Sequence, residues 1–249
     1  MRTSTVDIRT PDGVADAYLT RPDDDERHPG VLLIMDAFGL RPRIEEIADR
    51  IAAHGYAVLA PNVFYRAGRA PVLPFPDMSE EGARGEFMKA VRPLMNVLTP
   101  ERIAADGAAY LDELVKVADE PVGITGYCMG ARLGWWIAAA HPERVAALAG
   151  FHGGGLATDD AESPHRSAAA LSKAELYFGH ADQDPSNTAE QIATLEAALD
   201  EAGVRHRSEV YAGARHGYTM ADTQVYDEQA SERHFAALLD LLDRTLARR

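Results

Sequence analysis

The sequence predicts a chain of the α/β class, in which a mostly parallel sheet is covered by helices on both faces. Short continuous apolar runs, such as 30–35 and 56–60, are typical of strands that are buried on both faces of a parallel sheet. These runs alternate with longer segments in which apolar residues recur at helical spacing, as in 44–51. Because the alternation continues to the end of the chain, we expect neighbouring strands to run parallel.

The predicted strands share one signal, which is a short run of apolar or β-branched residues bounded by turn residues. The turn sequence Pro11-Asp12-Gly13 joins the first two strands and predicts an antiparallel hairpin at a sheet edge. We expect strands at 5–10, 14–20, 30–35, 56–60, 122–125, 145–149, 175–178 and 207–211.

The predicted helices are recognised by apolar spacing and by the residues at their ends. Gly55 is a typical helix end, and Thr99-Pro100-Glu101 combines an N-cap, a first-position proline and a first-turn acid. A capping-box pattern opens another helix at 188–191. We expect helices at 44–51, 79–95, 99–117, 131–140, 188–202 and 228–246. The proline-containing segment 61–78 shows no periodicity, and long irregular segments are often functional.

Composition and charge limit the possible functions. The chain has 249 residues, of which 46% are apolar, and we interpret it as one globular domain over 1–249. A net charge of −14 argues against nucleic acids and anionic membranes as partners. The single cysteine excludes an internal disulfide framework and a cysteine-rich zinc site. The sequence shows neither a signal peptide nor a run of about 20 apolar residues, so we expect a cytoplasmic protein of unspecified oligomeric state.

The run Gly126-Tyr127-Cys128-Met129-Gly130 lies between a predicted strand and a predicted helix. A nucleophile elbow has this layout, usually with serine at its centre. The turn is too tight for side chains on either flank, which explains the glycines two residues before and after the cysteine. A thiol at the beginning of a helix is favoured in its thiolate form. A lone cysteine is also commonly a small buried hydrophobe, so the interpretation depends on residues further along the chain.

Those residues are an aspartate and a histidine that follow two later strands. A thiol nucleophile needs a base, and the imidazole that serves as base needs a carboxylate to orient it. The order nucleophile, acid, histidine is that of the α/β-hydrolases. We expect the triad to be Cys128, Asp182 and His216, with Asp184 as the alternative acid.

Acyl transfer also requires N–H donors for a developing oxyanion. The residue after the nucleophile supplies one donor, here Met129, and the loop after an earlier strand supplies the second, here Ala37. Asp36 either faces the thiol or caps a turn, and His152 either lines the pocket or is structural.

At these residues the chain resembles the dienelactone hydrolase family, and the resemblance covers nearly the whole chain. Members are α/β-hydrolases with a Cys-Asp-His triad that open the lactone ring of dienelactone without a metal or an organic cofactor. The resemblance therefore implies hydrolysis of a lactone or small carboxylic ester by Cys128, Asp182 and His216, with Ala37 and Met129 as oxyanion donors. The segments that carry the resemblance are Gly126-Tyr127-Cys128-Met129-Gly130, Asp36-Ala37-Phe38-Gly39, Gly179-His180-Ala181-Asp182 and Ala214-Arg215-His216-Gly217-Tyr218.

The resemblance also suggests how the substrate is held. In the family an acid contacts the resting thiol, and Asp36 occupies that place, where the best-known members have glutamate. Those members bind the substrate carboxylate with arginines, one of them shortly after the catalytic histidine, but here Thr219-Met220-Ala221 follows Tyr218. The natural substrate therefore stays open. The candidate substrate-binding residues are Arg66, Arg69, Arg84, Tyr127 and His152.

Two other functions are compatible with these patterns. A protein of this fold could bind a small ligand without turning it over, or the same site could cleave a thioester or a peptide. The triad pattern, with all three groups at predicted strand ends, favours ester or lactone hydrolysis over a binding function.

Overall fold

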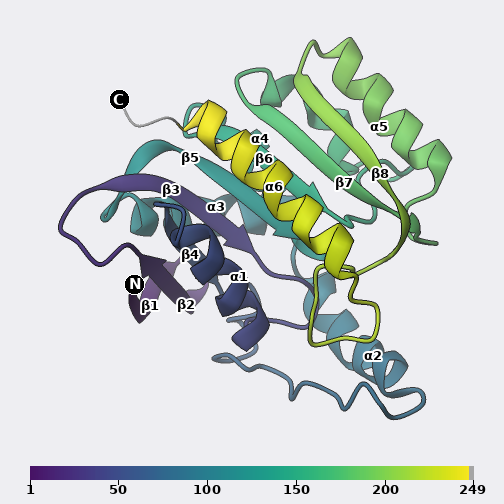
Figure 1. The fold of residues 1–249 in the computed structure, drawn as a ribbon, viewed down its shortest axis with the longest axis horizontal. Helices are drawn as coiled ribbons and strands as arrows, with labels where there is room; N and C mark the ends of the chain where they lie inside the picture. The colour runs from purple at the N-terminus through teal and green to yellow at the C-terminus, as the bar shows by residue number, and fades with distance from the viewer. Residues whose placement is uncertain (247–249) are drawn as a thin grey trace.

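The structure is a computed structural model that describes residues 1–246. Eight strands form one sheet in the order β1-β2-β4-β3-β5-β6-β7-β8 (Figure 1). The strands are β1 (Arg2–Thr10), β2 (Gly13–Arg21), β3 (His28–Ile34), β4 (Ala57–Pro61), β5 (Ala118–Tyr127), β6 (Val145–Phe151), β7 (Glu175–Gln183) and β8 (Arg205–Arg215). The helices are α1 (Pro42–Ala52), α2 (Ala83–Asn96), α3 (Pro100–Leu114), α4 (Met129–Ala140), the 3-10 helix η1 (Pro164–Leu171), α5 (Ala189–Glu201) and α6 (Glu228–Thr245).

The sheet is parallel except at one edge. Strand β2 runs antiparallel to both of its neighbours, β1 and β4, and β4 is followed across the sheet by β3, β5, β6, β7 and β8, all parallel. The register pairs Thr10 with Gly13 at the hairpin turn. Both the predicted edge hairpin and the predicted α/β class with a mostly parallel sheet are confirmed.

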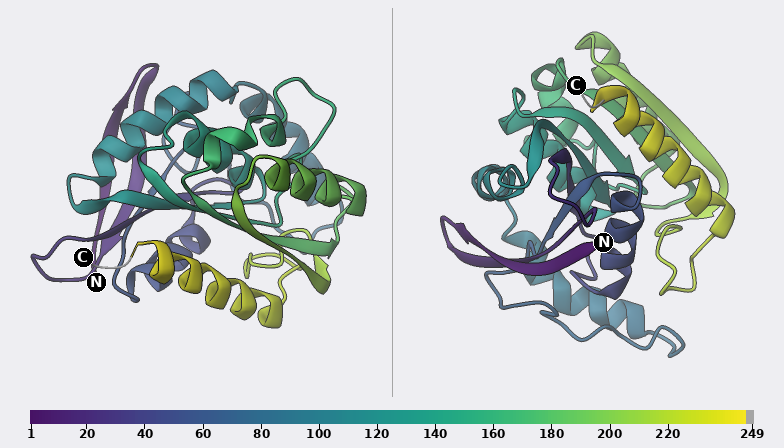
Figure 2. Two further views of the ribbon diagram at one scale, coloured as in Figure 1. Left: turned by 90° about the horizontal axis from the view of Figure 1, so that it is seen from above. Right: turned by 60° about the vertical axis from the view of Figure 1, so that its left-hand side comes forward.

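Helices cover both faces of the sheet. Helices α1 and α6 pack on one face, and α3, α4 and α5 pack on the other (Figures 1 and 2). Helix α2 lies beyond the carboxyl ends of the strands, the edge at which open α/β sheets gather their functional groups (Figure 1). None of the helices within residues 1–246 is long and apolar enough to cross a membrane.

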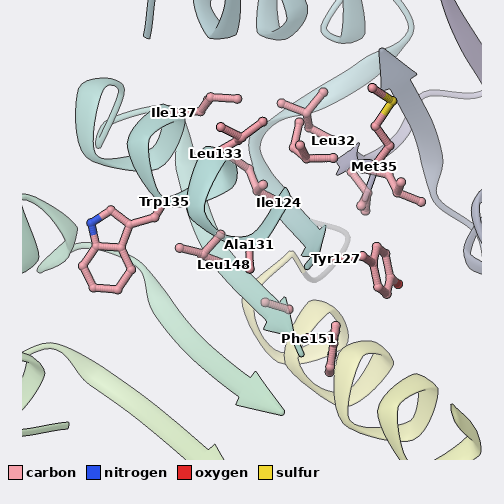
Figure 3. Packing of buried hydrophobic residues seen from close by; sticks show 14 of the residues in the cluster. Leu32, Met35, Ile124, Tyr127, Ala131, Leu133, Trp135, Ile137, Leu148 and Phe151 are labelled. Carbon is pink, nitrogen blue, oxygen red and sulfur yellow. The ribbon is translucent and has the colours of Figure 1, made fainter. Parts of the chain in front are cut away.

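The core on either side of β5 holds the central strands in place. Leu133 of α4 lies against Ile124 of β5, whereas Tyr127 and Phe151 lie beside α6 on the opposite face (Figure 3). All four side chains have 0% exposure. Burying an apolar side chain of this size contributes about 1.5–3 kcal/mol relative to leaving it in water. Packing on both faces therefore fixes the end of β5, where the predicted nucleophile follows.

One local prediction was wrong, and one short helix was not predicted. Ser79 does not cap α2, which begins at Ala83 after Gly82, a residue with φ of 81°. The backbone N–H and hydroxyl of Ser79 instead donate to the Asp77 carboxylate and form a separate turn. The 3-10 helix η1 was not predicted, because Pro164–Leu171 is too short to show a helical period.

Candidate active site

The cysteine lies at the tip of a tight turn between β5 and α4. Cys128 has φ of 53° and ψ of −116°, a conformation that L-residues rarely adopt. A Cβ added at Gly126 would lie 2.2 Å from the Gly130 carbonyl oxygen, and one added at Gly130 would lie 2.3 Å from that of Ile34. The Cys128 N–H donates to the carbonyl oxygen of Phe151 at 3.0 Å. Positions 126 and 130 therefore have no room for a Cβ, which explains the glycines in the predicted elbow.

The imidazole of His216 joins the thiol to a carboxylate. Its Nε2 lies 3.0 Å from Cys128 Sγ, and its Nδ1 lies 2.6 Å from Asp184 Oδ2. The histidine follows β8 and the aspartate follows β7, so the carboxyl ends of neighbouring strands bring them together. The arrangement has the form of nucleophile, base and orienting acid.

The carboxylate beside His216 is that of Asp184, the alternative acid, and not that of Asp182. Strand β7 continues to Gln183, so Asp182 still belongs to the strand and its Oδ2 accepts the Gly213 N–H at the surface. Asp184 is the first residue beyond the strand, and its buried Oδ1 also accepts from the N–H and hydroxyl of Ser186. The sequence Asp184-Pro185-Ser186 carries the signal that was missed, because an aspartate that accepts from the N–H two residues later forms an Asx turn.

The pKa values of His216 and Asp184 are shifted by the groups around them. Burial disfavours the charged form of His216, but the Cys128 thiolate and the Asp184 carboxylate outweigh it and raise the pKa of His216 to about 10. Burial likewise opposes ionisation of Asp184, but the hydrogen bonds from His216 and Ser186 lower its pKa below the usual value. The surroundings of His216 therefore favour its imidazolium form.

A cavity of about 100 Å³ opens beside the thiol. Its lining is largely apolar and includes Phe38, Met88 and Val225. Ala37, a predicted oxyanion donor, lines this cavity. Met129, the other predicted donor, is the first residue of α4, so its N–H has no acceptor within the helix.

Asp36 lines the cavity, but its carboxylate is held by an arginine. Arg41 Nη1 and Nη2 lie 2.6 and 3.1 Å from the two Asp36 oxygens, and the Phe38 N–H donates to Oδ1 at 2.9 Å. The hydrogen bonds within residues 1–246 include none between Asp36 and Cys128, so the predicted contact with the thiol is not found. Arg41 also binds Asp222 in a bidentate manner, at 2.6 and 3.2 Å. Sequence reasoning missed Arg41, because its pairing with Asp222 is visible only in the fold.

Three of the five predicted substrate-binding residues lie elsewhere. Tyr127 is fully buried in the core (Figure 3). Its hydroxyl is 2.9 Å from Nε2 of His234 on α6. Arg66 is bound in a bidentate manner by Asp106, at 2.8 and 3.1 Å. Arg69 pairs with an aspartate of β1 at 2.8 Å. These arginines hold the N-terminal hairpin and the segment after β4, which is why the sequence alone could not exclude them.

The other two line the cavity. Arg84 is exposed in the first turn of α2. His152 follows β6, with φ of 40° and 0% exposure, and its Nε2 is 2.8 Å from Thr219 Oγ1. Burial, together with the charge on His216, lowers the pKa of His152 well below its usual value, so this imidazole is neutral. Among residues 1–246 no cluster of three or more histidine, cysteine, aspartate or glutamate side chains could hold a metal ion.

A family model and a relative of 30% identity indicate one family, and solved structures share the fold. The family model described as the dienelactone hydrolase family matches residues 15–246. A protein of Synechocystis sp. assigned as a carboxymethylenebutenolidase is 30% identical over 222 residues, which are 86% of this chain and 85% of that protein. The crystal structure of a Klebsiella pneumoniae protein assigned as a dienelactone hydrolase superposes with a TM-score of 0.85 at 22% identity and covers 98% of both chains. A cold-adapted esterase from an Arctic intertidal metagenomic library gives a TM-score of 0.70 at 17% identity over 98% of this chain and 94% of its own. The predicted α/β-hydrolase fold is confirmed.

The choice between the two aspartates can be tested on the thiol itself. Asp184→Asn is expected to slow alkylation of Cys128 by iodoacetamide at pH 7 by about tenfold or more, because the imidazolium that favours the thiolate loses its carboxylate. Asp182→Asn removes the same charge and is the matched control, with an expected change below about twofold. Since Cys128 is the single cysteine, the rate reports on this site alone. Slower alkylation in Asp182→Asn, with Asp184→Asn unaffected, would reverse the assignment.

The raised pKa of His216 also predicts how stability depends on pH. The pKa is about 10 in the folded protein and near 6.5 in an unfolded chain. The imidazolium therefore contributes stability that is fully present below about pH 6.5 and is lost as pH rises towards 10. Under reducing conditions, the difference in unfolding free energy between wild type and His216→Gln should fall by about 3 kcal/mol from pH 7 to pH 10. The exposed His54→Gln is the control, and an unchanged difference for His216→Gln would contradict the prediction.

Proposed function

Because this chain belongs to the dienelactone hydrolase family, we propose that it hydrolyses a lactone or a small carboxylic ester through a covalent acyl-thiol on Cys128. One observation carries the proposal: His216 Nε2 lies 3.0 Å from Cys128 Sγ while its Nδ1 lies 2.6 Å from Asp184. At these distances His216 can take a proton from the thiol, and Asp184 can orient the imidazole.

In the first half of the reaction the Cys128 thiolate attacks the carbonyl carbon and forms a C–S bond. The carbonyl oxygen becomes an oxyanion, which accepts hydrogen bonds from the N–H groups of Ala37 and Met129. When the tetrahedral intermediate collapses, the ester C–O bond breaks and the leaving oxygen takes a proton from the His216 imidazolium. With a lactone, this oxygen remains attached to the acyl group, so both ends of the opened ring stay in the cavity.

In the second half, water attacks the thioester carbon and gives a proton to the now neutral His216. The C–S bond breaks, the thiolate is regenerated beside an imidazolium, and the product leaves as a carboxylic acid. Asp184 stabilises the positive charge of the imidazole in both halves and keeps its Nε2 directed at the reacting atoms.

The cavity favours a compact substrate. Its volume of about 100 Å³ and its apolar lining suit a small ring or short acyl chain. The name of the Synechocystis relative denotes hydrolysis of a butenolide lactone with a carboxymethylene group. Arg84 lines the cavity and makes no ion pair or side-chain hydrogen bond within residues 1–246, so it is available for such a carboxylate. We therefore propose a lactone or ester that carries one carboxylate near the scissile bond.

The nucleophile and base can be tested by turnover. Cys128→Ala and His216→Ala should each lower kcat/KM for p-nitrophenyl acetate and for dienelactone by about 10³-fold or more, because each removes a group that takes part in every step. His54→Ala, a change at the surface, should leave kcat/KM unchanged. If Cys128→Ala or His216→Ala keeps the wild-type kcat/KM, the assignment is refuted. Thermal stabilisation by these compounds without any product would favour the non-catalytic binding function.

The role of Arg84 can be tested by substrate charge. Arg84→Gln should raise KM for a carboxylate-bearing lactone by about tenfold and leave KM for neutral p-nitrophenyl acetate unchanged, since a charge-assisted hydrogen bond to the substrate is lost. Arg69→Gln removes an equal charge away from the cavity and should have no effect on either KM. An equal rise in both KM values for Arg84→Gln would show that Arg84 shapes the cavity and does not bind the carboxylate.

A further inference from the structure

A second, larger cavity of about 360 Å³ lies against the first turns of α4. Its volume is within the range of small-molecule sites. It is formed between helix α4 and the segment 155–164, which lies between β6 and η1 and includes the first residue of η1. The residues that line it include Arg132, Trp136, Gly155 and Ser163. None of the residues proposed for hydrolysis borders this cavity.

Arg132 is the unusual feature of the cavity. It is partly buried, and within residues 1–246 its guanidinium forms no ion pair or hydrogen bond; its Nε is completely buried without a partner. The buried Arg41 and Arg66, in contrast, are each held in a bidentate manner by carboxylates. Burial lowers the pKa of Arg132, although the charges of Cys128 and Asp160 oppose this. A cation withdrawn from water without a hydrogen-bond partner is costly, and an anion in the cavity would remove that cost.

Trp136 lies one helical turn after Arg132 and lines the same cavity. The Arg132 Cζ is 5.1 Å from the centre of a Trp136 ring, which is within the range of a cation–π contact. This contact leaves the N–H groups of the guanidinium without acceptors. The cavity thus presents the four Nη N–H donors of an arginine beside a flat apolar surface.

Two acidic residues at the rim set the charge that the cavity can accept. Asp160 and Glu162 line the cavity but are exposed, and Asp160 accepts a hydrogen bond from the Thr158 hydroxyl at 3.2 Å. Water screens both charges, and neither contacts Arg132. Their negative potential nevertheless disfavours a dianion such as phosphate more than it disfavours a monoanion.

The second cavity adjoins the catalytic one. Arg132 is four residues after Cys128 on the same helix. The segment 152–155 borders both spaces, because His152 lines the catalytic cavity and Gly155 lines the second. A Cβ added at Gly155, whose φ is 69°, would lie 3.8 Å from Arg132 Nη1. The glycine therefore leaves the guanidinium accessible from this side.

We propose that the second cavity is a binding site for a small monocarboxylate with a flat apolar body, which places its carboxylate on Arg132 and its body against Trp136. Arg–carboxylate pairs are often bidentate and are stronger than hydrogen bonds between neutral groups. The carboxylate could belong to a separate small molecule or to the far end of an ester substrate whose carbonyl lies at Cys128. The site itself does not depend on hydrolysis at Cys128.

Sodium benzoate and its neutral counterpart benzamide are suitable probes. Benzoate should raise the Tm of the wild-type protein and change its tryptophan fluorescence in a saturable manner, whereas benzamide should not. Arg132→Gln and, separately, Trp136→Leu should weaken the apparent benzoate affinity at least tenfold. Arg69→Gln removes an equal charge away from both cavities and should leave the affinity unchanged. Two variants on different side chains guard against loss of folding in one of them.

Three results would overturn the proposal: no stabilisation by benzoate, equal stabilisation in wild type and Arg132→Gln, or equal stabilisation by benzamide. Kinetics then distinguish the two sources of the carboxylate. A higher KM in Arg132→Gln for the p-nitrophenyl monoester of adipic acid, with KM for p-nitrophenyl acetate unchanged, identifies the far end of a substrate. Unchanged KM values together with Arg132-dependent benzoate binding identify a separate ligand. Benzoate binding needs no turnover, so its failure and the failure of the hydrolytic mechanism are distinguishable.

Discussion

The close approach of α4 to the end of β3 is the constraint on which the site depends. The backbone at Gly130 lies so near Ile34 that a Cβ added there would be 2.3 Å from the Ile34 carbonyl oxygen. This approach forces the chain to turn sharply at Cys128, and the hydrogen bond from its N–H to Phe151 holds the turn. The thiol consequently lies at the carboxyl edge of the sheet, where Asp184 follows β7 and His216 follows β8. The strain at Cys128 is sustained by packing on both faces of β5.

A network around Arg41 joins the two walls of the catalytic cavity. Through Asp36 it holds the loop that contains Ala37, and through Asp222 it holds the segment that follows His216. The Asp36 pair is almost completely buried, so removal of either partner would leave an uncompensated charge. The network therefore positions Ala37, a proposed oxyanion donor, relative to His216. It also binds Asp36, the acid that was expected to contact the thiol.

The parts of the site that sequence could predict are those determined by local backbone geometry. Gly126 and Gly130 predict the nucleophile elbow because a Cβ at either position would collide with backbone atoms. The sequence favoured Asp182 over Asp184 as the partner of His216 because the predicted strand ended too early. In the structure β7 extends to Gln183, and strand length depends on pairing with β8 rather than on local residues. Arg66 and Arg69 were candidates because they are arginines in a long irregular segment, and only the fold shows their carboxylate partners. The catalytic roles and the single domain over 1–249 stay predictions.

The most direct measurement of the central claim is the fate of the acyl group within the first turnover. Enzyme mixed with p-nitrophenyl trimethylacetate, whose bulky acyl group slows attack by water, can be quenched with acid at increasing times and digested for mass spectrometry. The account predicts a trimethylacetyl group on the peptide that contains Cys128, formed at the rate of p-nitrophenol release and lost as product acid appears. Two results would contradict the account. One is p-nitrophenol release over several turnovers with the acyl group on another residue. The other is such release with no acylated residue although hydrolysis is slower than acylation.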